Sequence, residues 1–138
     1  MTVSSILPDK SILVGNIIRH VFNLSKKQLE CFMNIVEMEN SGTCILNLVD
    51  VMDSERSIIQ KNLKVLMKKG LVERKSVTLT EFKERCTLNN REDISPKTNK
   101  GYLYIYSPLS SKELTSKIES ILSRWNTTIS EYFSTLQK

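Results

Sequence analysis

The 138-residue sequence holds few of the side chains and motifs on which catalysis and metal binding depend. His20 is its only histidine, and we interpret it as a partly buried structural residue because its neighbours are apolar. No glycine-rich phosphate loop, G-x-S-x-G or C-x-x-C motif occurs. His20 and the three cysteines include no closely spaced pair, which argues against a zinc site. We therefore predict no enzymatic activity, no metal and no cofactor.

Long apolar runs are also missing. A membrane span needs roughly 18 or more consecutive apolar residues. The N-terminal apolar segment is interrupted by Pro8 and Asp9 and has no basic region before it, unlike a signal peptide. We expect a cytoplasmic protein that does not enter a membrane.

The cysteines are few and widely spaced. Cys31, Cys44 and Cys86 are odd in number, which argues against a secreted disulfide framework. Cys86 follows Arg85, whose positive charge would lower the pKa of the thiol and favour redox reactivity. An ordinary exposed or half-buried cysteine is the simpler interpretation of Cys86.

The sequence does contain an excess of positive charge. Twenty Lys and Arg residues stand against fifteen Asp and Glu residues, which gives a net charge of +5 and an isoelectric point near 9.2. Residues 53–75 alone hold seven basic and three acidic residues, a net +4. Such a balance favours an anionic partner, either nucleic acid or an anionic membrane surface, and composition does not choose between them.

Apolar residues recur at helical spacing in five segments, and several segments have recognisable ends. Ser25 and Gln28 are spaced as a capping box, and we expect Leu29, Phe32, Met33 and Val36 to face inward. Asp53 and Ser54 are cap candidates for the fourth helix, and Gly70 stands where a C-terminal cap glycine belongs. The spacing predicts helices over 11–24, 25–40, 45–52, 55–69 and 110–136.

Two segments instead have the composition of β-strands. Residues 71–79 and 101–108 are rich in β-branched and aromatic residues. We expect them to form a hairpin whose polar tip, 80–100, is mobile. Thr43 and Cys44 form a brief extended link before the third helix.

The order of helix, short helix, turn, basic helix and hairpin is that of a winged helix-turn-helix. We predict an α+β, mainly helical fold: a winged helix-turn-helix with a long C-terminal dimerisation helix. The DNA-binding domain would span 1–109, with the wing at 71–108, and the dimerisation helix would span 110–138.

The basic helix, about 54–69, has two faces. Ile59, Leu63 and Leu66 would anchor it to the domain. The other face carries polar and basic side chains suited to the major groove of double-stranded DNA, with Ser57, Gln60 and Lys61 deepest. The predicted contacts of the recognition helix are Ser54, Arg56, Ser57, Gln60, Lys61 and Lys64. Arg56 would reach either a guanine edge or a phosphate. The wing would lie on the flanking phosphate backbone or in the minor groove. The predicted backbone and wing contacts are Lys68, Lys69, Arg74, Lys75, Arg85 and Arg91.

The C-terminal segment has heptad-like spacing, because its apolar residues step alternately by four and three positions. A helix of 27 residues would be about 40 Å long and would leave an apolar stripe that needs a partner. The simplest partner is a second copy, and whether the 11–24 helix joins this interface is left open. The predicted dimerisation residues are Leu114, Ile118, Leu122, Trp125, Ile129, Tyr132 and Leu136.

The stretch SGTCILNLVDVMDSERSIIQKNLKVLMKKGLVERK (41–75) resembles the winged-helix core of archaeal-type TrmB-like and MarR-like transcriptional regulators. YLYIYSPLSSKEL resembles the TrmB-like return strand and the following helix start. The resemblance implies promoter binding as a homodimer. Two departures limit it: the wing loop is longer than usual, and no sugar-binding domain follows, so carbohydrate sensing does not transfer.

An alternative stays open. Winged helices also serve as protein–protein interaction modules that do not bind DNA, and a fold alone does not decide function. A small-molecule effector is likewise left open, because no set of residues marks a site for it.

Overall fold

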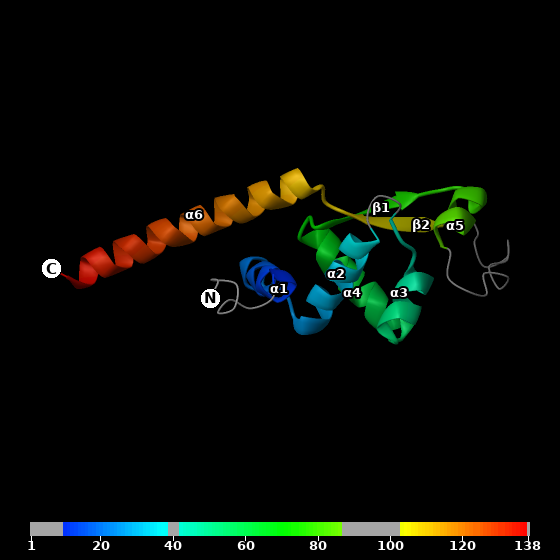
Figure 1. Cartoon of the computed structure of the whole chain (residues 1–138), viewed down its shortest axis with the longest axis horizontal. Coiled ribbons are helices and arrows are strands. Elements are labelled where there is room, and N and C mark those ends of the chain that lie inside the picture. The colour runs from blue at the N-terminus through cyan, green and yellow to red at the C-terminus, as the bar shows by residue number, and fades with distance from the viewer. Residues whose placement is uncertain (1–9, 39–41, 87–102, 138) are drawn as a thin grey trace, which may run out of the picture. The chain divides into compact units, whose positions relative to one another are not determined.

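The computed structural model describes residues 10–38, 42–86 and 103–137. The chain divides into two compact units (Figure 1). One unit contains residues 25–109. In the other, helix α1 (Lys10–Val21) packs against the long helix α6 (Ser111–Leu136). None of the described helices is long and apolar enough to cross a membrane.

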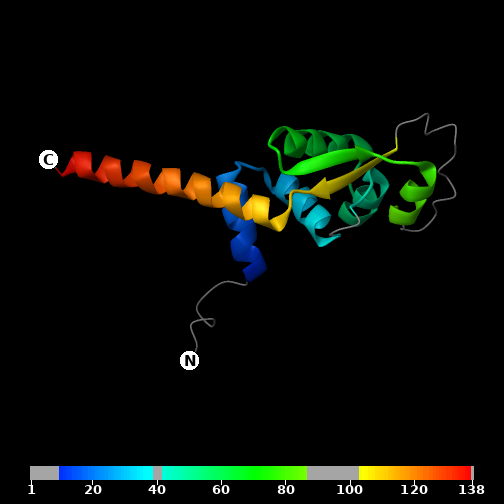
Figure 2. The same cartoon turned by 90° about the horizontal axis from the view of Figure 1, so that it is seen from above.

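The 25–109 unit is a winged helix-turn-helix, as predicted. Helices α2 (Lys26–Glu37), α3 (Ile45–Met52) and α4 (Arg56–Lys68) pack together, and strands β1 (Val72–Ser76) and β2 (Tyr104–Pro108) form the wing. The strands pair antiparallel and lie side by side in both views (Figures 1 and 2). The expected extended link is confirmed: Thr43 forms an isolated bridge with Tyr106, joining the start of α3 to the wing.

Local signals at the helix ends are largely confirmed. Ser25 and Gln28 form the predicted capping box at α2. Gly70, at φ 75°, ends α4 in a Schellman motif, because its N–H donates to Met67 and the N–H of Leu71 donates to Leu66. Leu66 and Leu71 are both fully buried there, so the junction between α4 and the wing is fixed.

The inward face of α2 differs from the prediction. Cys31, Phe32 and Ile35 are buried, whereas Leu29, Met33 and Val36 are only half-buried. The helix is therefore rotated relative to the face that we predicted from its longer apolar side chains. The smaller Cys31 is therefore in the core, where we had expected Leu29, Met33 and Val36.

The start of α4 is also a correction. Asp53 does not cap α4 but ends α3 in the left-handed conformation, at φ 48°. The hydroxyl of Ser54 donates to the carbonyl of Met52, and Glu55 is the N-cap residue of α4. A short polar residue tolerates positive φ, which is why Asp53 serves the tight turn rather than the next helix.

The wing contains a helix that we did not predict. The β1 strand ends at Ser76, and α5 (Leu79–Arg85) follows where we expected continued strand and a mobile polar tip. Thr78 caps α5 by accepting a hydrogen bond from the N–H of Glu81, a capping pattern that the sequence contains. Residues 87–102, which include Arg91 and the rest of the predicted tip, lie outside the described residues.

Cys86 is not the exposed or half-buried free cysteine that we expected. Its side chain is fully buried and forms a disulfide with Cys44, the N-cap residue of α3. The two cysteines belong to a hydrophobic cluster with Phe82, Leu103 and Ile105. The sequence separation of 42 residues hid the pair, because α5 returns to α3 only in the folded wing.

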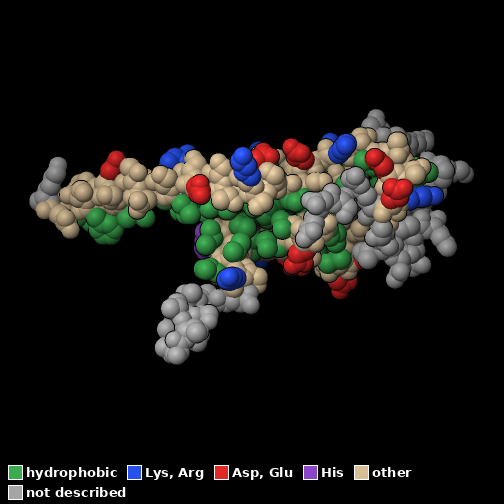
Figure 3. All heavy atoms as spheres, turned by 45° about the horizontal axis from the view of Figure 1, so that its top comes forward, with side chains coloured by type: hydrophobic (Ala, Val, Ile, Leu, Met, Phe, Trp, Pro, Cys, Tyr) green, Lys and Arg blue, Asp and Glu red, His purple; other side chains and the backbone are tan. Residues whose placement is uncertain are grey.

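In the unit formed by α1 and α6, much apolar surface faces solvent. α6 begins at the Ser110 cap, as predicted, and none of its residues is buried. Hydrophobic side chains gather along one side of its C-terminal part (Figure 3). His20, expected to be partly buried, is exposed beside a shallow hollow of about 190 Å³ between α1 and α6. The exposed large hydrophobic residues of this unit are Ile12, Leu13, Val14, Ile17, Leu122, Trp125, Ile129, Tyr132, Phe133 and Leu136.

Candidate nucleic-acid interface

Helix α4 has one buried and one exposed face. Ile59, Leu63 and Leu66 are buried and anchor it, as predicted, and the polar Asn62 is buried beside them. The side-chain nitrogen of Asn62 has no hydrogen-bond partner among the described residues. On the opposite face the side chains of the recognition set are exposed to solvent: Arg56, Ser57, Gln60, Lys61 and Lys64. Ser54, the sixth member of that set, is half-buried in the turn.

The N-terminus of α4 offers backbone donors as well. The N–H groups of Ile58 and Ile59 donate to the carbonyl of Glu55. The N–H groups of Arg56 and Ser57 lie too early in the helix to have an acceptor within it. No side chain among the described residues caps this end of α4. An uncapped helix start beside the side chains of Arg56 and Ser57 suits an anion.

The wing contributes a further cation, Arg74 on β1. The guanidinium of Arg74 on β1 lies 4.2 Å from the ring centroid of Tyr104 on β2, at cation–π distance. Both Arg74 and Arg56 lie close enough to lower the pKa of Tyr106, although burial outweighs them and raises that pKa above its ordinary value. Tyr106 thus lies within the electrostatic influence of one arginine at the start of α4 and of one on the wing.

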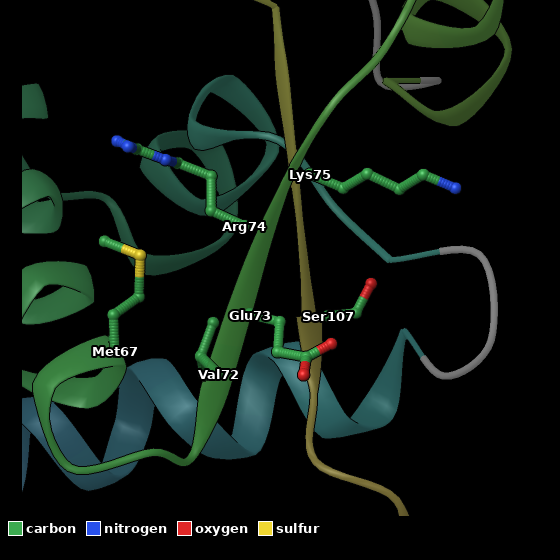
Figure 4. A pocket seen from close by; sticks show the side chains of 6 residues that line it. All are labelled: Met67, Val72, Glu73, Arg74, Lys75 and Ser107. Carbon is green, nitrogen blue, oxygen red and sulfur yellow. The ribbon is translucent and has the colours of Figure 1, made fainter.

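Arg74 and Lys75 leave β1 in opposite directions (Figure 4). They line an open hollow of about 600 Å³ along β1, which Met67, Val72, Glu73 and Ser107 also line. Glu73 in this hollow offsets part of the positive charge. Successive strand residues face opposite sides, so Arg74 and Lys75 carry their charges to opposite sides of β1.

The remaining predicted phosphate contacts are more scattered. Lys68 is exposed and Lys69 half-buried at the C-terminal end of α4. They lie about 18 Å from Arg56 along a 13-residue helix at 1.5 Å per residue. Arg85 ends α5, and Arg91 lies outside the described residues. Of the predicted cations, Arg56 and Arg74 both act electrostatically on Tyr106, whereas Lys68 and Lys69 lie at the far end of α4.

The position of the two wing tyrosines beside Arg74 was not predicted. Tyr106 is 4% exposed, so its side chain belongs to the core. The contact with Arg74 follows from the strand register, in which Arg74 pairs with Tyr106 and Ser76 with Tyr104. That register depends on the hairpin length and was not readable from the sequence.

The chemistry of the described residues offers no metal centre. No group of three or more His, Cys, Asp or Glu side chains within 10–38, 42–86 and 103–137 is arranged to hold a metal ion. The candidate functional site therefore consists of the exposed basic and polar side chains of α4 and β1.

The geometry defines a winged helix-turn-helix protein with a long C-terminal helix, and solved structures share this fold. A structure named as a possible transcriptional regulator from Methanosarcina mazei Go1 matches with a TM-score of 0.68 and 18% identity, covering 91% of this chain and 89% of that one. The ST1889 protein from the thermoacidophilic archaeon Sulfolobus tokodaii matches with a TM-score of 0.58 and 17% identity, covering 83% and 92%.

In sequence, the chain is 22% identical over 125 residues to the uncharacterized protein MJ1082 of Methanocaldococcus jannaschii. The match covers 91% of this chain and 87% of that protein. No protein-family model matches the sequence. At these identities the comparisons establish the fold.

Proposed function

We propose that the protein is a homodimeric, sequence-specific regulator of transcription that binds double-stranded DNA through α4 and the wing. The observation that carries the proposal is the exposed polar and basic face of α4, held outward by its buried face and joined at Tyr106 by Arg74 of the wing. The description of the Methanosarcina mazei structure as a possible transcriptional regulator agrees with it.

The contacts divide by position along α4. Ser57, Gln60 and Lys61 lie in its first half and would reach base edges, since recognition helices usually present their N-terminal residues to the major groove. Arg56, at the uncapped start of α4, and Arg74 of the wing would hold phosphates of the backbone. Lys68 and Lys69, at the far end, would supply attraction without sequence information.

The second copy is proposed from the apolar surface of α1 and α6. Ten large hydrophobic side chains there each expose between 38% and 60% of their surface. Together they expose on the order of 900 Å², which is comparable to the roughly 800 Å² that each partner buries in a stable interface. A symmetric dimer would present two copies of α4 to half-sites about one helical turn apart.

Selection of bound duplexes from a random-sequence pool tests the proposal. We expect one enriched, pseudo-palindromic site. Binding to it should weaken steeply as the salt concentration rises, because the Lys and Arg side chains release counterions from the phosphates when they bind. Gln60→Ala should change the enriched sequence. Lys68→Ala, a charge removed from the far end of the same helix, should weaken all duplexes similarly and keep the sequence preference.

Two outcomes would contradict this docking. If the pool yields no enriched sequence at any salt concentration, the winged helix serves another purpose, such as binding a protein. If a site is enriched but Gln60→Ala leaves it unchanged, a surface other than α4 reads the bases.

A further inference from the structure

The Cys44–Cys86 disulfide joins the wing helix to the helix-turn-helix. Cys44 is the N-cap residue of α3, and Cys86 is the C-cap residue of α5. The sulfur of Cys44 accepts a hydrogen bond from the N–H of Asn47, at 3.4 Å. The side-chain oxygen of the same buried Asn47 lies 3.7 Å from the sulfur of Cys86. One buried polar residue therefore contacts both sulfurs.

Among the described residues, few other contacts hold α5 in place. It has seven residues, well below the roughly 12 to 15 that a helix needs to be even marginally stable alone. Of its described side chains, Phe82 is buried and Leu79 is half-buried, both against the cluster that contains the disulfide. In contrast, α3 packs against both α2 and α4 and is bridged to β2 through Thr43. Breaking the disulfide should free α5 and leave the three-helix core intact.

The surroundings of the sulfurs also suit the reduced state. A thiolate on Cys44 would lie at the N-terminus of α3 and keep the hydrogen bond from Asn47, two features that stabilise a thiolate. A neutral thiol on Cys86 could donate to the side-chain oxygen of Asn47 at its present distance. Cys44 is thus the better leaving group, and Asn47 has a partner role in both redox states.

We propose that this disulfide is a redox-controlled tether of the wing, whose reduction by a dithiol releases α5 and weakens DNA binding. A thiolate of the reductant attacks the sulfur of Cys86, the S–S bond breaks, and Cys44 leaves as a thiolate. The second thiol of the reductant then attacks its own sulfur in the mixed disulfide. Cys86 is released and takes a proton, the two electrons having passed to the protein from the reductant, which becomes a disulfide.

Burial makes the reaction depend on local opening. Both sulfurs belong to fully buried residues, so no reductant reaches them while α5 is docked. Reduction therefore requires α5 to move away first and then prevents it from being fixed again. Reoxidation by a disulfide of the same class reverses the exchange.

The effect on DNA rests on the proposed function. α5 follows β1 after two residues and presents the exposed Lys83, and the N–H of Val77 donates to Leu103 at the end of the hairpin. Releasing α5 would loosen this end, where Ser76 pairs with Tyr104, the ring on which Arg74 rests. We expect reduced protein to bind its selected duplex about 3- to 10-fold more weakly, since wing contacts add affinity to those of α4.

Hydrogen exchange of the full chain with and without a dithiol tests the tether, with no DNA present. Reduction should speed exchange in 79–86 at least tenfold and leave 59–66 of α4 unchanged. The Cys44→Ser/Cys86→Ser variant should resemble reduced protein and ignore the dithiol, whereas Cys31→Ser, a matched control, should respond like the parent. If that double variant does not fold, reduced parent protein supplies the same comparison.

Equal exchange rates of 79–86 in both states overturn the proposal. A uniform rise of the exchange rates across 25–109 also overturns it, because the disulfide would then stabilise the whole winged domain and not α5 in particular. Duplex binding is measured on the same samples. Equal affinity in both states overturns the regulatory role. If oxidised protein binds no duplex, the proposed function fails, while the exchange data still decide the tether.

Discussion

Replacing Ile129 with glutamate tests the proposed dimer at the middle of the exposed stripe of α6. Ile129 exposes 54% of its surface within its own chain. If a second copy covers it, each chain buries on the order of 90 Å² there, which contributes about 2 kcal/mol at 25 cal/mol per Å². The two symmetric copies contribute about 4 to 5 kcal/mol, so losing them raises the dimer dissociation constant roughly a thousandfold. The burial of two carboxylates adds to this loss.

Sedimentation velocity over a range of concentrations measures the effect. Parent protein should sediment as a dimer and Ile129→Glu as a monomer, with circular dichroism showing equal helix content. Thr127→Glu is the matched control, because it places the same charge on the same helix at an exposed position outside the stripe. The reasoning fails if Ile129→Glu remains dimeric, or if parent protein is monomeric at every concentration.

Two further predictions concern the core of the winged domain. Gly42, at φ 72°, leaves no room for a side chain: an added Cβ would lie 2.5 Å from the Ile105 side chain and 2.8 Å from the Ser107 hydroxyl. Gly42→Ala should lower the free energy of unfolding by about 2 to 4 kcal/mol through backbone strain and overpacking, as urea denaturation would measure, and a parent-like midpoint would contradict it. Burial, with a smaller effect of Glu30, raises the pKa of Cys31 from 9.0 to about 12. Between these two pH values the Cys31 thiol stays protonated in the folded protein but ionises in the unfolded chain. The stability that Cys31 contributes is therefore full below pH 9 and is lost between pH 9 and about 12. A Cys31→Ala variant should lose less stability across that range, and identical pH profiles of parent and variant would refute the raised pKa of Cys31.

The parts of the fold that the sequence predicts are those encoded locally. The Ser25 cap, the Gly70 stop and the anchors of α4 depend on residues within one or two turns of each other, and all are confirmed. The helix α5 was encoded equally locally, by Thr78 and Glu81, but the β-type residues before it and the polar residues after it suggested a continued strand and a polar tip.

The features that escaped prediction depend on distant segments. The disulfide needs α5 to return to the start of α3, and the approach of Arg74 to Tyr104 and Tyr106 needs the strand register. Helix α1 groups with α6 although nearly ninety residues separate them along the chain. For the candidate interface, helical periodicity indicated which side chains of α4 are exposed, but not that Arg74 lies over the Tyr104 ring.

The central claim is that α4 contacts the bases. Amide chemical shifts of the isotopically labelled full chain, recorded as the selected duplex is added, test it most directly. The largest changes should fall on the first half of α4, including Ser57, Gln60 and Lys61, and on Arg74 of the wing, with α2 little affected. Changes concentrated elsewhere, with these amides unmoved, would contradict the account.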